Sequence, residues 1–185
     1  MNARIADVIL INKVNSAKRE DVETVRKNIK KMNPKAIIIE SNSVVTVEEP
    51  EKVKGKKVIV VEDGPTLTHG GTSYGAGTIA ARQLNCEIID PRPYAVGTIK
   101  ETYKEFPNLG KVLPAMGYSE EQMKELEDTI NKAEVDAILV GTPFDLARLL
   151  KINKPSTRVR YTIQEIGKPD LKEIIEEFVK KHNLK

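Results

Sequence analysis

The amino-acid sequence predicts an α/β protein in which helices cover both faces of a mainly parallel sheet, a three-layer, Rossmann-like arrangement. Seven apolar, β-rich runs alternate with segments of helical periodicity, as in consecutive β-α units. Several runs are apolar at successive positions, which is typical of strands buried on both faces. The runs cover residues 7–11, 36–40, 57–61, 86–90, 111–113, 136–140 and 158–163.

The seventh run differs from the others because its polar and apolar residues alternate. Val159, Tyr161 and Ile163 share one face of the predicted strand, and Arg158 and Arg160 share the other. This pattern suits an edge strand or a strand beside a site. The two arginines either face a polyanionic ligand or are solvated edge charges.

Capping residues and apolar stripes mark the helices. The predicted caps are Ser16, Thr98 with Glu101, and Ser119 with Gln122, and Pro169 is expected to open the last helix. The buried face of that helix is predicted to be Leu171, Ile174, Ile175, Phe178 and Val179. Residues 48–56 are polar and form either a linker between two α/β units or an ordinary surface loop.

Composition argues against several classes of protein. Lys and Arg total 30 against 27 Asp and Glu, no basic run stands out and Trp is absent, so a nucleic-acid partner is not expected. No apolar stretch reaches the length of a membrane span and no signal peptide is recognisable, which predicts a cytoplasmic protein. The single cysteine, Cys86, lies in an apolar run and is expected to be a structural thiol. The Lys- and Glu-rich composition points to a thermophile.

Asn12, Lys13 and Asn15 follow the first run, at the carboxyl end where parallel sheets bind ligands. In P-loop GTPases an Asn-Lys-x-Asp motif holds this place, and its Asp accepts two hydrogen bonds from guanine. Asn15 cannot accept both, which argues against strict GTP use and allows ATP. We predict a nucleotide-base site formed by these three residues and by Ser41, which follows the second run. The alternative is a simple strand-to-helix turn next to a polar loop.

The segment with the clearest functional character is residues 62–77, between the third run and a predicted helix. Its glycines allow the backbone to approach a ligand, and the following helix N-terminus offers amides to an anion. The predicted phosphate- or substrate-binding residues here are Gly64, Thr66, Thr68, Gly70, Gly71, Tyr74, Gly75 and Gly77. His69 and Asp63 are the predicted catalytic residues, because His69 can donate to a phosphate or shuttle a proton and Asp63 can take a proton or hold Mg²⁺ through water. The alternative is a flexible surface loop whose glycines only make turns.

Arg92 lies between two prolines after the fourth run, again at a carboxyl end. Its guanidinium matches a phosphate bidentately, so we predict that it joins the phosphate site on the glycine-rich segment. The alternative is a surface arginine in a rigid loop. The sequence defines no set of metal ligands.

Several blocks together resemble the cyclic 2,3-diphosphoglycerate synthetase family, whose members are also described as predicted GTPases. The longest is VEDGPTLTHGG at residues 61–71, followed by YGAG at residues 74–77. Further blocks lie at residues 141–146, 152–155 and 158–161, so the resemblance covers nearly the whole chain. It implies ATP-dependent closure of an intramolecular phosphoanhydride on 2,3-diphosphoglycerate, with Mg²⁺, in an archaeal type of cytosol.

The family's Walker-type Gly-x-x-x-x-Gly-Lys-Ser/Thr motif is absent from this sequence, which therefore resembles only the C-terminal part of the family. The resemblance implies that residues 1–50 are the C-terminal remnant of a P-loop-type nucleotide domain. It implies that residues 51–185 are an α/β domain carrying the glycine-rich ligand loop.

Three functions are compatible with these observations. In the first, the chain is part of an ATP-dependent ligase acting on a phosphorylated small molecule, and it is inactive alone because the P-loop region is supplied in cis or by a separate subunit. In the second, it is a non-catalytic module that binds a nucleotide or phosphometabolite. In the third, it is a GTPase-like subunit that works with a P-loop partner. The choice between ATP and GTP stays open, as does assembly into a homo-oligomer.

Overall fold

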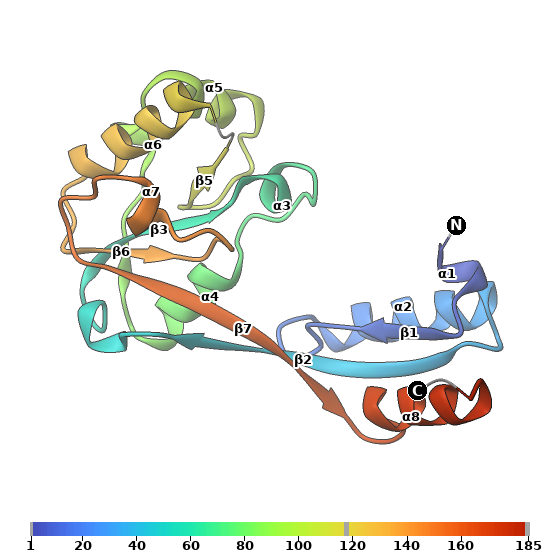
Figure 1. The fold of residues 1–185 in the computed structure, drawn as a ribbon. Helices are drawn as coiled ribbons and strands as arrows, with labels where there is room; N and C mark the ends of the chain where they lie inside the picture. The colour runs from blue at the N-terminus through green and yellow to red at the C-terminus, as the bar shows by residue number, and fades with distance from the viewer. Residues whose placement is uncertain (1, 117–118, 184–185) are drawn as a thin grey trace. The chain divides into compact units, whose positions relative to one another are not determined.

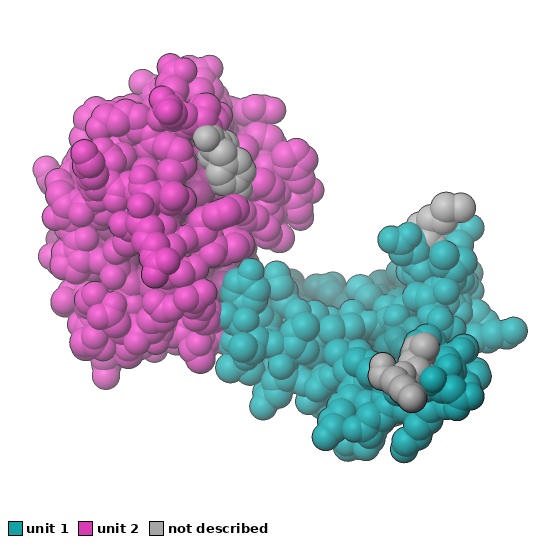
Figure 2. Space-filling model, viewed as in Figure 1, with its two compact units in different colours: residues 1–44, 161–185 teal, residues 45–160 magenta. Residues whose placement is uncertain are grey.

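The computed structural model describes residues 2–116 and 119–183 and divides the chain into two compact units. Unit 1 comprises residues 1–44 and 161–185, and unit 2 comprises residues 45–160 (Figure 2). The chain passes from one unit to the other within two long strands, β2 (Ile37–Val47) and β7 (Ser156–Ile166). The units differ from the predicted domains 1–50 and 51–185, because residues 161–185 group with the N-terminal segment.

The sheet of unit 2 is centred on β3 (Lys57–Asp63) (Figure 1). On one side β3 pairs with β6 (Ala137–Val140), which pairs in turn with the first residues of β7. On the other side it pairs with β4 (Glu87–Ile88) near its start and with β5 (Leu113–Ala115) near its end. All these pairs are parallel, so the predicted mainly parallel sheet is confirmed.

Two apolar clusters cover the two faces of this sheet, because alternate residues of a strand point to opposite faces. In β3 and β6, Ile59, Val61, Ile138 and Val140 belong to one cluster, and Val58, Val60, Ala137 and Leu139 belong to the other. The first cluster includes residues of α3 (Gly64–Thr68), α5 (Gly97–Glu105), α6 (Glu120–Lys132) and α7 (Leu146–Leu149), and the second includes residues of α4 (Ala76–Gln83). Burial on both faces explains why these strands are apolar at successive positions.

Two short 3₁₀ helices, η1 (Pro50–Lys52) and η2 (Arg92–Tyr94), complete unit 2. Cys86 lies between α4 and β4, where it is partly buried. Its thiol donates to the carbonyl of Val53 at 3.1 Å. Burial raises the pKa of this thiol, so the structure agrees with a structural cysteine.

Unit 1 contains α1 (Asn2–Ile5), β1 (Val8–Ile11), α2 (Arg19–Met32), α8 (Leu171–Lys181) and parts of β2 and β7. β1 and β2 are parallel, with Val8 opposite Ile37. β7 follows β2 in the strand order. It runs antiparallel to β2, because Asn42 contacts Gln164 while Glu48 contacts Arg158.

Each of the seven predicted runs overlaps a strand of the structure, but several bounds differ: β4 is shorter than its run, β5 begins at the last residue of its run, and β2 and β7 are longer. β2 continues through residues 41–43, which were predicted as a loop. Ser41 is fully buried there, and its hydroxyl donates to Asn12 Oδ1, so the strand tolerates a polar side chain. The first residues of β7 lie between β2 and β6, so the edge-strand interpretation does not hold for them. The pairing with β6 ends at Arg158.

The predicted caps give mixed results. Ser119 caps α6 by accepting a hydrogen bond from the N–H of Gln122, as predicted. The prediction for Ser16 is wrong, because α2 begins three residues later and the Ser16 hydroxyl donates to the Lys13 carbonyl instead. Thr98 is also not a cap, because it lies inside α5 and donates to the side chain of Glu125.

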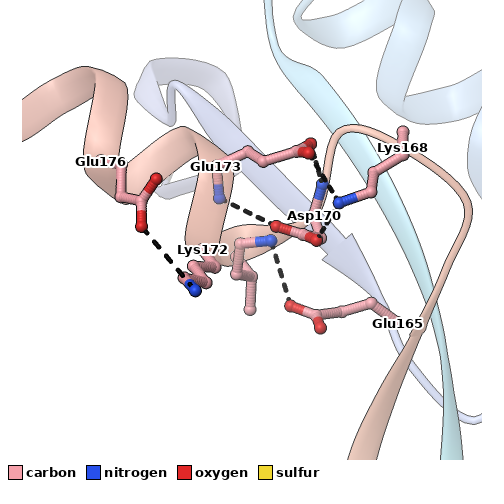
Figure 3. A network of polar contacts seen from close by, with 7 residues as sticks. Glu165, Lys168, Asp170, Lys172, Glu173 and Glu176 are labelled. Carbon is pink, nitrogen blue, oxygen red and sulfur yellow. Dashed lines mark hydrogen bonds and ion pairs between the residues drawn. The ribbon is translucent and has the colours of Figure 1, made fainter.

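The start of α8 is held by a network of charged residues (Figure 3). Asp170, rather than the preceding Pro169, is the N-cap, and it forms a capping box with Glu173. Lys168 forms ion pairs with both acids, and Glu165 accepts a hydrogen bond from the N–H of Leu171. The predicted buried face of this helix is wrong, since α8 contains no buried residue.

This network predicts an acid-sensitive helix start. The Lys168 ammonium and the Glu173 amide lower the pKa of Asp170, so its stabilising effect is present above the unfolded pKa and is lost as the pH falls through the folded pKa. We expect hydrogen-exchange protection in the first turn of α8 to fall between about pH 4 and pH 2. Asp170→Asn, which keeps a capping oxygen, should remove this acid response. Glu176→Gln, one helical turn further along, is the control and should keep it.

Candidate functional site

The side chain of Glu62, near the end of β3, is hydrogen-bonded to the start of α4. It is 2% exposed, and its carboxylate accepts hydrogen bonds from the N–H groups of Gly75, Gly77 and Thr78 at 3.0, 3.3 and 2.8 Å. The Thr78 hydroxyl adds a fourth at 3.0 Å. Burial raises the pKa of Glu62, although the hydrogen bonds act in the opposite direction. The first amides of α4 are therefore bound to the protein's own carboxylate.

This arrangement corrects the expectation that the N-terminus of α4 presents its amides to an anionic ligand. Gly75 and Gly77 both pack against Glu62. An added Cβ would lie 2.5 Å from Glu62 Oε2 at Gly75 and 3.3 Å from Oε1 at Gly77. The two glycines thus permit the close approach of Glu62, and the sequence-based assignment of both to a phosphate site has no support in their contacts.

Asp63, the next residue, caps α3. Its Oδ2 accepts from the Thr66 N–H at 3.2 Å and from the Thr66 hydroxyl at 2.6 Å. Its Oδ1 accepts no hydrogen bond from the residues that the structure describes. Thr66 is therefore bound to Asp63, while one carboxylate oxygen of Asp63 stays available for a ligand.

His69 lies at the other end of α3, where it is the C-cap residue. Its Nδ1 lies 3.0 Å from the Thr68 hydroxyl, which also donates to the Gly64 carbonyl. The two predicted catalytic residues, Asp63 and His69, therefore flank one short helix. No hydrogen bond among the described residues joins them.

Residues 70–74 form an exposed backbone segment, called here the N–H strip. Within the part of the chain that the structure describes, none of these five amides donates a hydrogen bond to another residue. Gly71 has a φ of +63°, a conformation that favours glycine. Thr72 fixes the strip to α3 through a hydrogen bond to the Thr66 carbonyl at 3.3 Å, and the Tyr74 ring lies beneath Arg82. These amides, rather than those of α4, can receive an anion.

Arg92 is engaged by protein groups. Its Nη1 lies 3.1 and 3.0 Å from the two carboxylate oxygens of Asp90, and its Nη2 donates to the Leu109 carbonyl. The next residue, Gly110, donates to the Ser73 carbonyl at 3.0 Å. The Arg92 loop and the glycine-rich segment therefore meet through residues 109–110, but the guanidinium is already paired with an acid.

A small pocket lies at the carboxyl ends of β3, β5 and β6, which is where parallel α/β sheets commonly bind ligands. It is lined by Asp63, Ala115, Met123, Leu126, Thr142, Phe144, Leu146 and Leu149. Asp63 is the one ionisable side chain among these described lining residues. The pocket therefore combines a carboxylate with largely apolar walls.

The two arginines of β7 form ion pairs with acidic side chains of the protein. Arg158 donates to the Pro143 carbonyl at 2.8 Å and forms an ion pair with Asp145, the residue that precedes α7. Arg160 forms an ion pair with Glu48. Both guanidinium groups thus have acidic partners within unit 2.

The predicted nucleotide-base residues lie together in unit 1. Ser41 donates to Asn12 at 2.9 Å, and the Asn15 amide exchanges two hydrogen bonds with the backbone of Ser43, at 3.0 and 3.1 Å. The structure therefore places the two predicted segments side by side. Both polar atoms of the Asn15 amide are hydrogen-bonded to β2. Lys13 is exposed and has a φ of +64°.

The described residues contain no group of three or more His, Cys, Asp or Glu side chains that could hold a metal ion. Among the described helices, none has the length and apolar character needed to cross a membrane.

Glu62 and the apolar pocket wall were not identified from the sequence. An acid directly after four buried strand residues is a usable signal, because a buried carboxylate requires hydrogen-bond donors nearby. Met123, Leu126, Leu146 and Leu149 carry no comparable signal, since their spacing is that of ordinary core residues.

The fold and the site define an α/β protein of the Rossmann-like class with its candidate site at the carboxyl edge of a parallel sheet. No family model matches the sequence. The chain is similar to arginine synthetase ArcE of Thermococcus kodakarensis, with 57% identity over 180 residues. The match covers 97% of this chain and 40% of that relative, so the chain spans about two fifths of the length of the curated relative.

This relative agrees with the sequence-based prediction only at the coarse level of a ligase-type enzyme. Its name refers to arginine, whereas the resemblance described above implies 2,3-diphosphoglycerate. The cyclic diphosphoglycerate reaction is therefore not confirmed.

Proposed function

We propose that this chain is the substrate-binding part of a ligase-type enzyme and that it binds arginine or a related amino acid. The observation that carries this proposal is the Asp63 side chain, which lines the pocket at the carboxyl edge of unit 2 and whose Oδ1 accepts no hydrogen bond from the described residues. Thr66 connects Asp63 with the N–H strip of residues 70–74, because it bonds to Asp63 and to Thr72. The cationic side chain of such an amino acid can pair with the Asp63 carboxylate, and its α-carboxylate can accept hydrogen bonds from the N–H strip.

Closure of a phosphoanhydride on 2,3-diphosphoglycerate is the second candidate. It is favoured by the same N–H strip, since backbone amides in such loops bind phosphate well. The Asp63 carboxylate would repel a polyanion, and Arg92 is already paired with Asp90. These charges favour an amino acid over a bisphosphate.

ATP and Mg²⁺ are assigned to the complete enzyme rather than to this chain. The described residues offer no acidic cluster for a metal, and the sequence contains no Walker-type motif for the phosphates. Nucleotide hydrolysis would supply the energy for bond formation in such a ligase. The role proposed here for Asp63 is to bind and orient the substrate. A P-loop region, in cis or as a partner subunit, would complete the enzyme, and a binding module or GTPase-like subunit without turnover is the alternative.

The test is calorimetric titration of the 185-residue chain with L-arginine. We expect Asp63→Asn to weaken binding by about 10- to 100-fold, because a hydrogen bond to a charged group is lost. Asp136→Asn is the matched control: Asp136 accepts from the Lys57 N–H at the opposite end of β3, so its loss should leave binding unchanged.

Two outcomes contradict the proposal. One is the absence of arginine binding at millimolar concentration, and the other is equal affinity of the parent and Asp63→Asn. Binding of 2,3-diphosphoglycerate that strengthens in Asp63→Asn would favour the second candidate.

A further inference from the structure

More of the large apolar side chains of unit 1 are exposed than are buried. Among the described residues, ten of the thirteen large exposed hydrophobic side chains belong to this unit. Its buried apolar side chains are Ile11, Ile29 and Ile39. A domain that exposes its large apolar residues in this proportion presents a surface for another polypeptide.

Strand β1 has the composition of a central strand but lies at an edge. All four of its residues, from Val8 to Ile11, are aliphatic, and β1 is the terminal strand in the sheet order. Asp7 O accepts from Ile37 N, so the parallel pattern directs the N–H and C=O groups of Val8 and Leu10 away from β2. An uncovered apolar edge of this kind is a template for a further strand.

The second half of α8 presents a separate apolar stripe. The helix is fixed at its start by the network of Lys168, Asp170 and Glu173 (Figure 3). In spite of this anchoring, Ile175 and Phe178 are 58% and 54% exposed. The helix therefore holds a defined apolar stripe that unit 1 itself does not cover.

We infer that the free edge of β1 and the apolar stripe of α8 are two docking sites for the part of a ligase-type enzyme that lies outside this chain. The relative that matches 97% of the chain does so with 40% of its own length, so most of that protein lies outside the matched part. The occupant supplies a strand that pairs with β1 and apolar side chains that cover the stripe of α8. The identity of this occupant rests on the proposed function, while the two sites themselves do not.

Hydrogen exchange tests the β1 edge without a substrate, so its result is independent of arginine binding. In the 185-residue chain, the amides of Val8 and Leu10 should exchange readily. At the aligned positions of full-length arginine synthetase ArcE, we expect protection to be at least about 100-fold greater, as for a paired strand. Equal, rapid exchange in both proteins would overturn the inference.

Phe178→Glu tests the α8 stripe, with Glu177→Lys as the control on the same helix. In the 185-residue chain, Phe178→Glu should change the melting temperature by less than about 2 °C, because the side chain is exposed. The same change at the aligned position of full-length arginine synthetase ArcE should lower the melting temperature of that protein by about 5 °C or more. A chain that sediments as a dimer and becomes monomeric in Phe178→Glu would instead identify a second copy as the occupant and overturn the inference.

Discussion

Replacing Glu62 by Ala should lower the free energy of unfolding by about 3–5 kcal/mol. The substitution leaves the N–H groups of Gly75, Gly77 and Thr78 without their acceptor and creates a cavity where Glu62 is 2% exposed. Urea unfolding followed by circular dichroism measures the effect. Glu87→Ala, at an exposed acid of the same sheet, is the control and should change stability by less than about 0.5 kcal/mol.

Glu62→Gln separates the charge of this side chain from its hydrogen bonds. The amide oxygen can replace Oε1, which accepts three of the four hydrogen bonds, so we expect a smaller loss of about 1–2 kcal/mol. Because burial raises the folded pKa of Glu62, its contribution is fully present below the unfolded pKa and declines as the pH rises through the folded pKa. The stability difference between the parent and Glu62→Gln should therefore shrink as the pH rises above about 4, the ordinary pKa of a glutamate. A difference that grows over this range would contradict the direction of the shift.

Gly141→Ala should cost about 2–3 kcal/mol, because there is no room for a methyl group at this position. A Cβ would lie 2.5 Å from Glu62 Oε2 and 2.9 Å from Gly77 N. The carboxylate cannot retreat without losing its hydrogen bonds to the start of α4. Thermal and urea unfolding measure the loss.

Gly71→Ala is the matched control for this substitution. Gly71 has nothing within 4 Å of an added Cβ, and its cost of about 1 kcal/mol comes only from the positive φ of +63°. If Gly141→Ala proved no more harmful than Gly71→Ala, the tight contact between Gly141 and Glu62 would not be a determinant of stability.

The strands were predictable because their apolar pattern is local. In β3, Val58 and Val60 pack on one face and Ile59 and Val61 on the other. Burial on both faces therefore appears in the sequence as consecutive apolar residues. The length of β2 was not predictable, because the partners of this part of the strand are distant in the sequence: Ser41 bonds to Asn12, 29 positions away, and β7 lies beside β2.

The candidate site was predictable as a segment but not as a set of contacts. Glycines and hydroxyl groups mark residues 63–77 in the sequence, and the structure places these residues at the carboxyl edge. The partners of Glu62 lie 13 to 16 positions further along the chain, and no local rule pairs a strand acid with a distant helix start. The prediction that one face of α8 is buried was wrong for another reason. The apolar periodicity of a helix predicts burial without specifying which polypeptide covers it.

The adjacent acids at the end of β3 hold the starts of two helices. Asp63 Oδ2 binds Thr66 at the first turn of α3, whereas Glu62 binds the first turn of α4. In the proposed site a cation would pair with Asp63 Oδ1 while Oδ2 keeps its hydrogen bonds to Thr66. The carboxylate that binds the substrate would then be oriented by the start of α3, and Glu62 would hold the other end of the segment. Substrate affinity and the order of residues 64–74 would in this way be thermodynamically linked through a single side chain.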